Sequence, residues 1–357
     1  MEDMAIDRSF WSGRRVLLTG HTGFKGSWLS LWLQRLGAKV SGFAIGVPTR
    51  PSLFQMASVS DGMDSVEADV RDRAKLVAAV RDFEPEIVIH MAAQSTVLGG
   101  YASPVETFET NVMGTVNLVD ALRKSGTVRA ALVITSDKCY RQTFLTESYR
   151  EDDPLGGDDP YSASKACAEI AAAAYRSAFL SSEEQRRTAL ATARAGNVLG
   201  GGDWTENRLV PDLISAFRAG KIAHVRNPDH VRPWQHVLDP LAGYLRLVEL
   251  LFREGASYAE AWNFGPAASS CISVGELADR VAYLWGAGAR WDTVSRLSPR
   301  ESSQLRVDAS KSRTRLDWRP RLDLDTCLTW TVEWYKTIDA GGSARSATTG
   351  QIERYPG

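Results

Sequence analysis

Two residues four positions apart, Tyr161 and Lys165, have the side-chain types and the spacing for proton transfer. At the start of a helix, positions i and i+4 lie on one face, so the lysine ammonium lies beside the phenol. A neighbouring cation favours the phenolate, and a fall of a tyrosine pKa from about 10 toward 7 needs about 4 kcal/mol of differential stabilisation. We therefore predict that Tyr161 is an acid-base group whose pKa Lys165 lowers, although the same spacing arises by chance in many helices.

Three further reactive side chains, Ser136, Asp137 and Lys138, stand where the predicted strand 131–136 ends. The carboxyl ends of parallel strands form the edge at which ligands bind. We expect this strand end and the helix that begins near Tyr161 to meet at that edge. A solvated surface pair is the alternative interpretation of Asp137 and Lys138.

A glycine-rich loop precedes these residues in the chain. The predicted strand 16–19 runs into Gly20-His21-Thr22-Gly23-Phe24-Lys25-Gly26, and an apolar helix over 27–36 follows. Gly20 permits a tight turn, Gly23 lets the backbone approach a pyrophosphate, and Gly26 allows close packing of helix and sheet. The helix N-terminus faces the phosphates. The loop predicts a dinucleotide cofactor, and an ordinary turn between strand and helix is the alternative.

The identity of the cofactor depends on the residues near its ribose. NAD sites usually have an acidic residue about 20 positions beyond the loop, but Phe43 and Ala44 stand there. His21 and Lys25 would suit either a 2′-phosphate or the pyrophosphate. We expect NAD, and NADP stays open.

Further cofactor contacts are expected where later strands end. Asp69 and Val70 follow the third predicted strand and suit the adenine, although Asp69 or Asp72 is equally suited to cap the next helix. The segment Ala92-Ala93-Gln94 follows the fourth strand, at the carboxyl edge where cofactors bind.

Short β-branched runs alternate with longer helical patterns from residue 15 to residue 195, which is typical of βαβ units in a parallel sheet. We expect an α/β fold with a Rossmann-type doubly wound parallel sheet and a smaller C-terminal α/β lobe that binds the substrate. The cofactor domain is expected over residues 1–200, with parts of 220–260 returning to it. The lobe is expected mainly over 201–340, and 341–357 form a mobile tail. Strands are predicted over 16–19, 38–44, 65–69, 87–90, 131–136, 188–195 and 261–265.

Composition restricts the possible partners. Lys and Arg total 42 while Asp and Glu total 43, so nothing suggests a nucleic acid or a membrane as the partner. The four cysteines form no CxxC pair, which argues against a metal site and disulfides. No apolar run approaches the roughly 20 residues that cross a bilayer, and the first residues lack the core of a signal peptide. We expect a protein of the reducing cytoplasm.

Nine segments together resemble the extended short-chain dehydrogenase/reductase superfamily and, within it, the nucleotide-sugar epimerases and dehydratases, most closely the dehydratases of CDP-D-glucose. The segments are TGHTGFKGSWLSLWL (19–33), PSLF (51–54), HMAAQ (90–94), PVET (104–107), TNVMGT (110–115), TSDKCY (135–140), YSASK (161–165), RAGNVLGGGDW (194–204) and RPWQHVLDPL (232–241). The resemblance implies an NAD-dependent lyase that oxidises sugar C4, eliminates water across C5 and C6 and returns the hydride to C6. It also implies that Phe24 and Asn111 contact the cofactor.

The implied reaction assigns a task to each matched side chain. Tyr161 takes the C4 hydroxyl proton, Lys165 lowers the pKa of Tyr161 and holds the nicotinamide ribose, and Ser136 hydrogen-bonds the C4 oxygen. Asp137 suits the acid for the departing C6 hydroxyl, and Lys138 suits the base for the C5 proton. Related dTDP-sugar dehydratases resemble this strand but carry Asp-Glu there. A lysine base must be neutral, and Lys165 and the oxidised nicotinamide are the candidate cations that favour neutrality.

A nucleoside diphosphate is an anion, and a protein of near-zero net charge must bind it through specific arginines. By resemblance Arg232 matches a pyrophosphate clamp, Arg300 is a second candidate, and Asn197 and, with less support, Asn263 match substrate contacts. In relatives the segment after HMAAQ resembles PLVRxSY, whereas this chain has STVLGGY over 95–101. Because that loop is expected to face the sugar, another nucleotide or hexose stays open.

Two other functions use parts of the same pattern. A 4-epimerase or 4-reductase shares the Tyr-Lys pair but needs no acid and base at C5 and C6, so Asp137-Lys138 favours the dehydratase. A non-catalytic NAD(P)-binding scaffold usually lacks the Tyr-Lys pair. The helices expected over 104–125 and 161–180 have apolar faces that favour a homodimer, and burial of those faces within one chain is the alternative.

Overall fold

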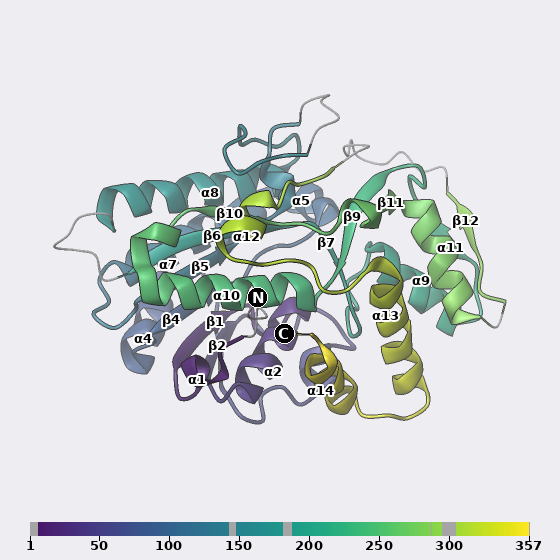
Figure 1. The fold of residues 1–357 in the computed structure, drawn as a ribbon, viewed down its shortest axis with the longest axis horizontal. Helices are drawn as coiled ribbons and strands as arrows, with labels where there is room; N and C mark the ends of the chain where they lie inside the picture. The colour runs from purple at the N-terminus through teal and green to yellow at the C-terminus, as the bar shows by residue number, and fades with distance from the viewer. Residues whose placement is uncertain (1–5, 143–147, 181–187, 287, 295–304, 357) are drawn as a thin grey trace.

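The computed structural model describes residues 6–142, 148–180, 188–286, 288–294 and 305–356. A seven-stranded parallel sheet lies at its centre, with the strand order β10-β6-β5-β4-β1-β2-β3 (Figure 1). The strands are β1 (Arg15–Thr19), β2 (Lys39–Ala44), β3 (Asp64–Glu67), β4 (Ile87–His90), β5 (Ala130–Ile134), β6 (Ala189–Ala195) and β10 (Ala261–Phe264). The strand order reverses between β1 and β4, and doubly wound sheets bind their ligands at such a switch point. The expected fold class is confirmed.

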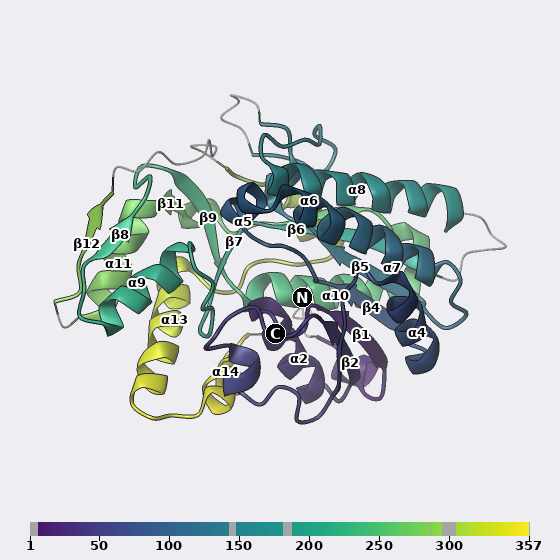
Figure 2. The same ribbon diagram turned by 180° about the vertical axis from the view of Figure 1, so that it is seen from behind.

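Helices cover both faces of this sheet (Figures 1 and 2). On one face lie α2 (Phe24–Arg35) and α10 (Leu238–Glu254), and on the other lie α4 (Arg73–Phe83), α7 (Gly114–Leu122) and α8 (Pro160–Phe179). Every residue of β4 and β5 is buried, as expected for a strand covered on both faces. The edge strand β3 is exposed along its whole length.

The predicted helix 104–125 is interrupted. It consists of α6 (Pro104–Phe108), a π-helical turn (Glu109–Met113) and α7. A π-helical turn adds a residue to one turn and changes the direction of the side chains around it, and such turns are frequent at functional sites.

The second lobe is built from two small sheets and three helices. Its sheets contain β7 (Asn197–Leu199), β9 (Val231–His236) and β11 (Cys271–Ser273), and β8 (Ala223–Val225) with β12 (Trp291–Thr293). Its helices are α9 (Leu209–Arg218), α11 (Val274–Trp285) and α13 (Leu324–Asp339). Within the part of the chain expected to form this lobe, α10 lies on the main sheet and β10 pairs with β6 as its last strand. Short helices complete the chain: α1 (Arg8–Trp11), α3 (Leu53–Met56), α5 (Val97–Ala102) and α12 (Ser310–Arg315).

The predicted mobile tail over 341–357 needs correction. Residues 344–354 form helix α14 (Ala344–Arg354), which lies beside α2 (Figure 1). The Tyr355 hydroxyl donates a 2.8 Å hydrogen bond to Asp239 Oδ1, and both side chains are buried. A composition of small polar residues suggested mobility, but buried contacts with distant segments hold this helix in place. None of the helices in the described segments is long and apolar enough to cross a membrane.

Candidate active site

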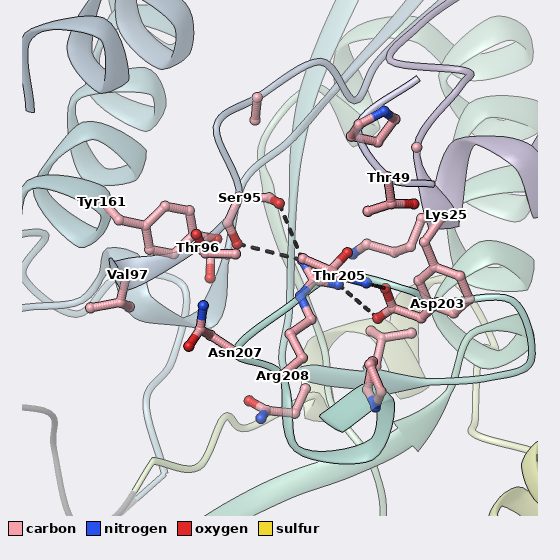
Figure 3. A pocket seen from close by; sticks show the side chains of 18 of the residues that line it. Lys25, Thr49, Ser95, Thr96, Val97, Tyr161, Asp203, Thr205, Asn207 and Arg208 are labelled. Carbon is pink, nitrogen blue, oxygen red and sulfur yellow. Dashed lines mark hydrogen bonds and ion pairs between the residues drawn. The ribbon is translucent and has the colours of Figure 1, made fainter. Parts of the chain in front are cut away.

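A cavity of about 590 Å³ lies at the carboxyl edge of the sheet and is lined by residues of both lobes (Figure 3). The predicted site residues that line it are Gly20, Gly23, Phe24, Lys25, Gly26, Asp69, Val70, Ala92, Ala93, Ser136, Asp137, Lys138, Tyr161, Lys165, Asn197 and Arg232. The sheet topology brings the glycine loop and residues 69–70, 92–93 and 136–138 together, because each segment follows the carboxyl end of a strand of the main sheet. The start of α8 adds Tyr161 and Lys165.

The glycine loop presents backbone, and not side chains, to the cavity. Gly20 has a φ of +73°, and a Cβ there would lie 2.6 Å from the backbone nitrogen of Ala92. A Cβ on Gly26 would collide with the carbonyl oxygen of Gly20. Helix α2 begins directly after Gly23, so its free N–H groups meet the space that a pyrophosphate would need. This surface fits a dinucleotide.

The two basic residues of the loop point in different directions. His21 is buried, and its Nε2 shares a 2.7 Å hydrogen bond with Ser65 Oγ. It does not line the cavity, so its side chain has a structural role here, and the contact of His21 with the cofactor stays a prediction. Lys25 does line the cavity, and burial lowers its pKa to about 8, helped by the neighbouring Arg208 and Lys165 cations.

The two aspartates after β3 have separate tasks. Asp72 Oδ1 accepts a 3.1 Å hydrogen bond from the backbone nitrogen of Lys75 and so caps α4. Asp69 lines the cavity, and Arg71 lies 2.6 Å from its Oδ2. The hydrogen bond from Arg71 holds the pKa of Asp69 below its usual value. The capping alternative therefore applies to Asp72, and Asp69 is available at the cofactor end.

Asn111 and Gln94 brace the cavity wall from behind. Asn111 lies in the π-helical turn, where its Oδ1 accepts a 2.8 Å hydrogen bond from the Gln94 backbone nitrogen. Its Nδ2 donates to the Gln94 carbonyl at 3.0 Å and to Ser164 Oγ at 2.8 Å. Neither residue lines the cavity. Their side chains tie the loop after β4 to α8, and the contacts of both residues with the cofactor stay predictions.

The Tyr161-Lys165 pair is buried, and burial is the largest influence on the pKa of both groups. Burial raises the pKa of Tyr161 to about 12; a hydrogen bond with Ser136 lowers it, and the charge of Asp137 raises it further. The Lys165 ammonium donates a 3.2 Å hydrogen bond to the carbonyl of Ile134. This bond anchors the ammonium at the end of β5, and the lowering of the Tyr161 pKa by Lys165 together with the charge of the nicotinamide stays a prediction.

Asp137 and Lys138 form an acid-amine pair inside the cavity. Asp137 is only 1% exposed, and its Oδ1 accepts a 3.0 Å hydrogen bond from Ser136 Oγ. Lys138 Nζ lies 3.7 Å from the same oxygen, and its side chain is 23% exposed. The burial of Asp137 rules out the solvated surface pair. A carboxyl group and an amine thus lie beside the phenol of Tyr161 in one cavity.

A buried polar network fixes the strand that carries these groups. The Arg194 guanidinium pairs with Glu169 at 2.9 Å and donates to the Tyr140 hydroxyl at 2.8 Å. The Tyr140 hydroxyl in turn donates to Asn263 Oδ1 at 2.7 Å. Asn263 is fully buried and does not line the cavity. The predicted substrate contact by Asn263 is wrong, since its amide completes this network.

The substrate residues predicted in the second lobe have three different outcomes. Arg232 lines the cavity, donates a 3.0 Å hydrogen bond to the carbonyl of Val231 and shares one of 3.1 Å with His230 Nδ1. Asn197 also lines the cavity, and its buried Oδ1 accepts no hydrogen bond from the described residues. Arg300 lies outside the described residues.

Sequence reasoning missed Arg208, which spans the cavity (Figure 3). Its guanidinium pairs with Asp203 Oδ2 at 3.0 Å and donates to Ser95 Oγ at 3.2 Å. Residues 95–98 of the divergent loop line the same cavity. The available signal was a cation directly before the helix 209–218, after the glycine-rich turn 200–202. Thr205, Asn207 and Arg226 line the cavity as well.

Residues 17–331 match the family model described as GDP-mannose 4,6 dehydratase. The chain belongs to this family. It is 46% identical over 352 residues to the CDP-glucose 4,6-dehydratase of Salmonella typhimurium, and the match covers 98% of each chain. A probable dTDP-glucose 4,6-dehydratase of Sinorhizobium fredii is 25% identical, with 90% and 92% covered. The resemblance drawn from the nine segments is confirmed.

Members of related enzyme classes share the fold. The dTDP-glucose 4,6-dehydratase of Bacillus anthracis, solved in complex with NAD, has a TM-score of 0.76 at 22% identity and covers 92% of this chain and 99% of its own. The UDP-glucose 4-epimerase of Thermus thermophilus, also in complex with NAD, has a TM-score of 0.77 at 24% identity, with 90% and 99% covered. Because dehydratase and epimerase structures match equally well, the shared fold does not separate the two reactions.

Proposed function

We propose that this protein is an NAD-dependent CDP-glucose 4,6-dehydratase, a hydro-lyase that forms CDP-4-keto-6-deoxy-D-glucose. The observation that carries the proposal is the Asp137-Lys138 pair, which lines the cavity beside Tyr161. An epimerase has no use for an acid and a base at C5 and C6, whereas elimination of water needs both. The choice of CDP-glucose is supported by the relative of 46% identity.

Oxidation at C4 depends on Tyr161 and Ser136. Bound NAD supplies reversible hydride chemistry, accepting the C4 hydride and giving it to C6. Tyr161 accepts the proton of the C4 hydroxyl, and Ser136 positions the C4 oxygen. Because burial and the charge of Asp137 raise the pKa of Tyr161, formation of the phenolate depends on the charges that the occupied site adds.

Elimination depends on Asp137 and Lys138. The C4 ketone makes the C5 proton acidic, and the neutral amine of Lys138 accepts that proton. The C6–O bond then breaks, and the carboxyl proton of Asp137 leaves with the hydroxyl as water. Lys138 returns its proton to C5 when C6 becomes a methyl group, and the proton that Tyr161 took from the C4 hydroxyl passes to Asp137 and restores its acid form.

The choice of NAD over NADP is supported by the two basic residues of the glycine loop. His21 is turned away from the cavity and bonded to Ser65. Lys25 is coupled electrostatically to Asp137 and Lys165, at the catalytic end. Neither therefore offers a cation for a 2′-phosphate. Titration calorimetry with each dinucleotide tests this choice, and tighter binding of NADP would contradict it.

The nucleotide sugar is assigned to the second lobe. Residues 1–200, with the segments that return to the main sheet, hold the cofactor, and residues 201–340 hold mainly the nucleotide sugar. Arg208, Arg226 and Arg232 line the cavity on that side and supply the positive charge that a diphosphate needs. Arg300 stays a prediction.

The decisive experiment presents the purified protein with CDP-, dTDP-, GDP- and UDP-glucose. The expected result is loss of one water from CDP-glucose by mass spectrometry, with the alkali-induced absorbance of a 4-keto product. Formation of a C4 epimer would contradict the dehydratase. A preference for another nucleotide would contradict only the choice of CDP.

The proposal includes a homodimer formed through α6, α8 and the turn before α7. Apolar side chains on these elements remain exposed in the single chain: Val105, Phe108, Met113, Ile170 and Phe179. Sedimentation of the parent should give a dimer mass, and the double variant Val105→Glu/Ile170→Glu should give a monomer. A monomeric parent would refute the dimer.

A cytoplasmic location stays a prediction, in keeping with four unpaired cysteines.

A further inference from the structure

Tyr244, on α10 behind the cavity wall, has a hydroxyl that packing does not require. Its ring is fully buried and meets Phe264 edge-on, with centroids 5.3 Å apart. The hydroxyl makes no hydrogen bond with any described residue. A buried hydroxyl without a partner costs roughly 1–3 kcal/mol. Since a phenylalanine would fill the same space without this cost, the hydroxyl calls for a functional explanation.

The catalytic carboxyl group has an oxygen in the same situation. Asp137 Oδ1 accepts from Ser136, but the buried Oδ2 accepts no hydrogen bond from the described residues. A Cβ on Gly196 would lie 3.2 Å from Oδ2, so the backbone closes one side of this oxygen. The charge of Asp137, after burial, raises the pKa of the Tyr244 phenol. The carboxylate and the phenol therefore interact electrostatically, and no hydrogen bond joins them in the structure.

A third group, Lys25, completes this arrangement. Its Nζ lies 6.0 Å from the centroid of the Tyr244 ring and lines the cavity. Its charge also interacts with Asp137. The first turn of α2, the end of β5 and the middle of α10 thus place a cation, a carboxyl group and a phenol together.

We propose that Tyr244 is a positioning residue for the elimination of water and that it acts through Asp137. When the C6–O bond breaks, the carboxyl proton leaves with the hydroxyl as water and Asp137 becomes a carboxylate. The Tyr244 hydroxyl then donates to Oδ2, and Lys25 balances the new negative charge. Oδ1 stays directed at the substrate. This inference rests on the proposed function.

The test is Tyr244→Phe, with Tyr355→Phe as the matched control. Tyr355 is also buried, and its hydroxyl also donates to an aspartate, Asp239, but neither lines the cavity. For Tyr244→Phe, kcat should fall about 10-fold, less than the roughly 10²- to 10⁴-fold that a proton-transfer group contributes. KM for CDP-glucose should be unchanged, and reduced nicotinamide should accumulate because C4 oxidation precedes the slowed step.

Stability distinguishes this role from a structural one. Tyr244→Phe removes no hydrogen bond, so its Tm should equal or exceed that of the parent. Tyr355→Phe loses a bond, so its Tm should fall while kcat is retained. An unchanged kcat in Tyr244→Phe would overturn the inference, as would a fall in kcat matched by a fall in Tm. A parent that dehydrates none of the four nucleotide glucoses would refute the proposed function itself, before any variant is compared.

Discussion

The two sides of the cavity differ in the kind of surface that they present. On the cofactor side the surface is backbone, because Gly20 and Gly26 leave no room for a Cβ. On the nucleotide side the surface consists of long side chains from separate segments, among them Arg208 and Arg232. Backbone geometry recognises a constant group such as a pyrophosphate, whereas one substitution alters a side-chain surface. We therefore expect substrate choice to be decided in the second lobe and cofactor binding in the first.

The largest effect is expected where the two sides meet, at Lys138. Lys138→Met removes the amine proposed as the C5 base, so dehydration should fall by about 10³-fold while C4 oxidation continues. Single-turnover absorbance of reduced nicotinamide and the yield of 4-keto-6-deoxy sugar measure the two steps. Lys221→Met, at an exposed position outside the cavity, serves as the control. Product release by Lys138→Met at the parent rate would show that Lys138 is not the base.

Gly26→Ala tests the backbone surface on the cofactor side of the cavity. Its Cβ would collide with the Gly20 carbonyl, and overpacking of this kind costs about 1–3 kcal/mol. The affinity for NAD, measured by calorimetry, should fall by up to about 100-fold. Gly350→Ala is the control, because a Cβ there would meet nothing within 4 Å and the residue lies outside the cavity. Equal losses in the two variants would contradict a role for close packing.

Arg208→Lys tests the side-chain surface on the nucleotide side of the cavity. Lysine keeps the charge but loses the planar fork that joins Asp203 to Ser95. KM for the nucleotide sugar should rise about 10-fold, which corresponds to about 1.4 kcal/mol, while NAD affinity stays at the parent value. Steady-state kinetics and NAD titration separate these effects. An equal loss of NAD affinity would remove the distinction between the two sides.

The last prediction concerns stability, and it compares a buried histidine from each region. Burial lowers the pKa of His90, at the end of β4, and of His236, at the end of β9, to about 3. The unfolded chain takes up these protons near pH 6.5, so their stabilisation is complete above that pH and is lost as the pH falls toward 3. At about pH 5.5 each of the two histidines should lower the free energy of unfolding by about 1.4 kcal/mol.

Urea unfolding well above pH 6.5 and at about pH 5.5 measures this loss of unfolding free energy. His224→Gln, at an exposed position, should leave the pH dependence as in the parent. His90→Gln and His236→Gln should each reduce it. A pH dependence that survives in both variants would assign the loss to other groups.

Local patterns in the sequence were sufficient for much of the fold and for part of the site. Alternating apolar runs predicted the strands of the main sheet, and the loop Gly20–Gly26 and the end of β5 came to the cavity as expected. Their position follows from parallel topology alone, since the carboxyl ends of neighbouring strands share an edge. Residue types at those ends, such as Ser136 and Asp137, are therefore enough to indicate the chemistry.

Only the tertiary structure decided where individual side chains point and what surrounds them. His21 and Asn263 stand in the right segments but bond to Ser65 and to Tyr140, residues far away in the chain. Arg208 reaches Ser95 across more than a hundred positions, and Lys165 bonds to a strand carbonyl. Direction, burial and charge environment depend on partners that packing brings together, and spacing along one segment does not contain that information.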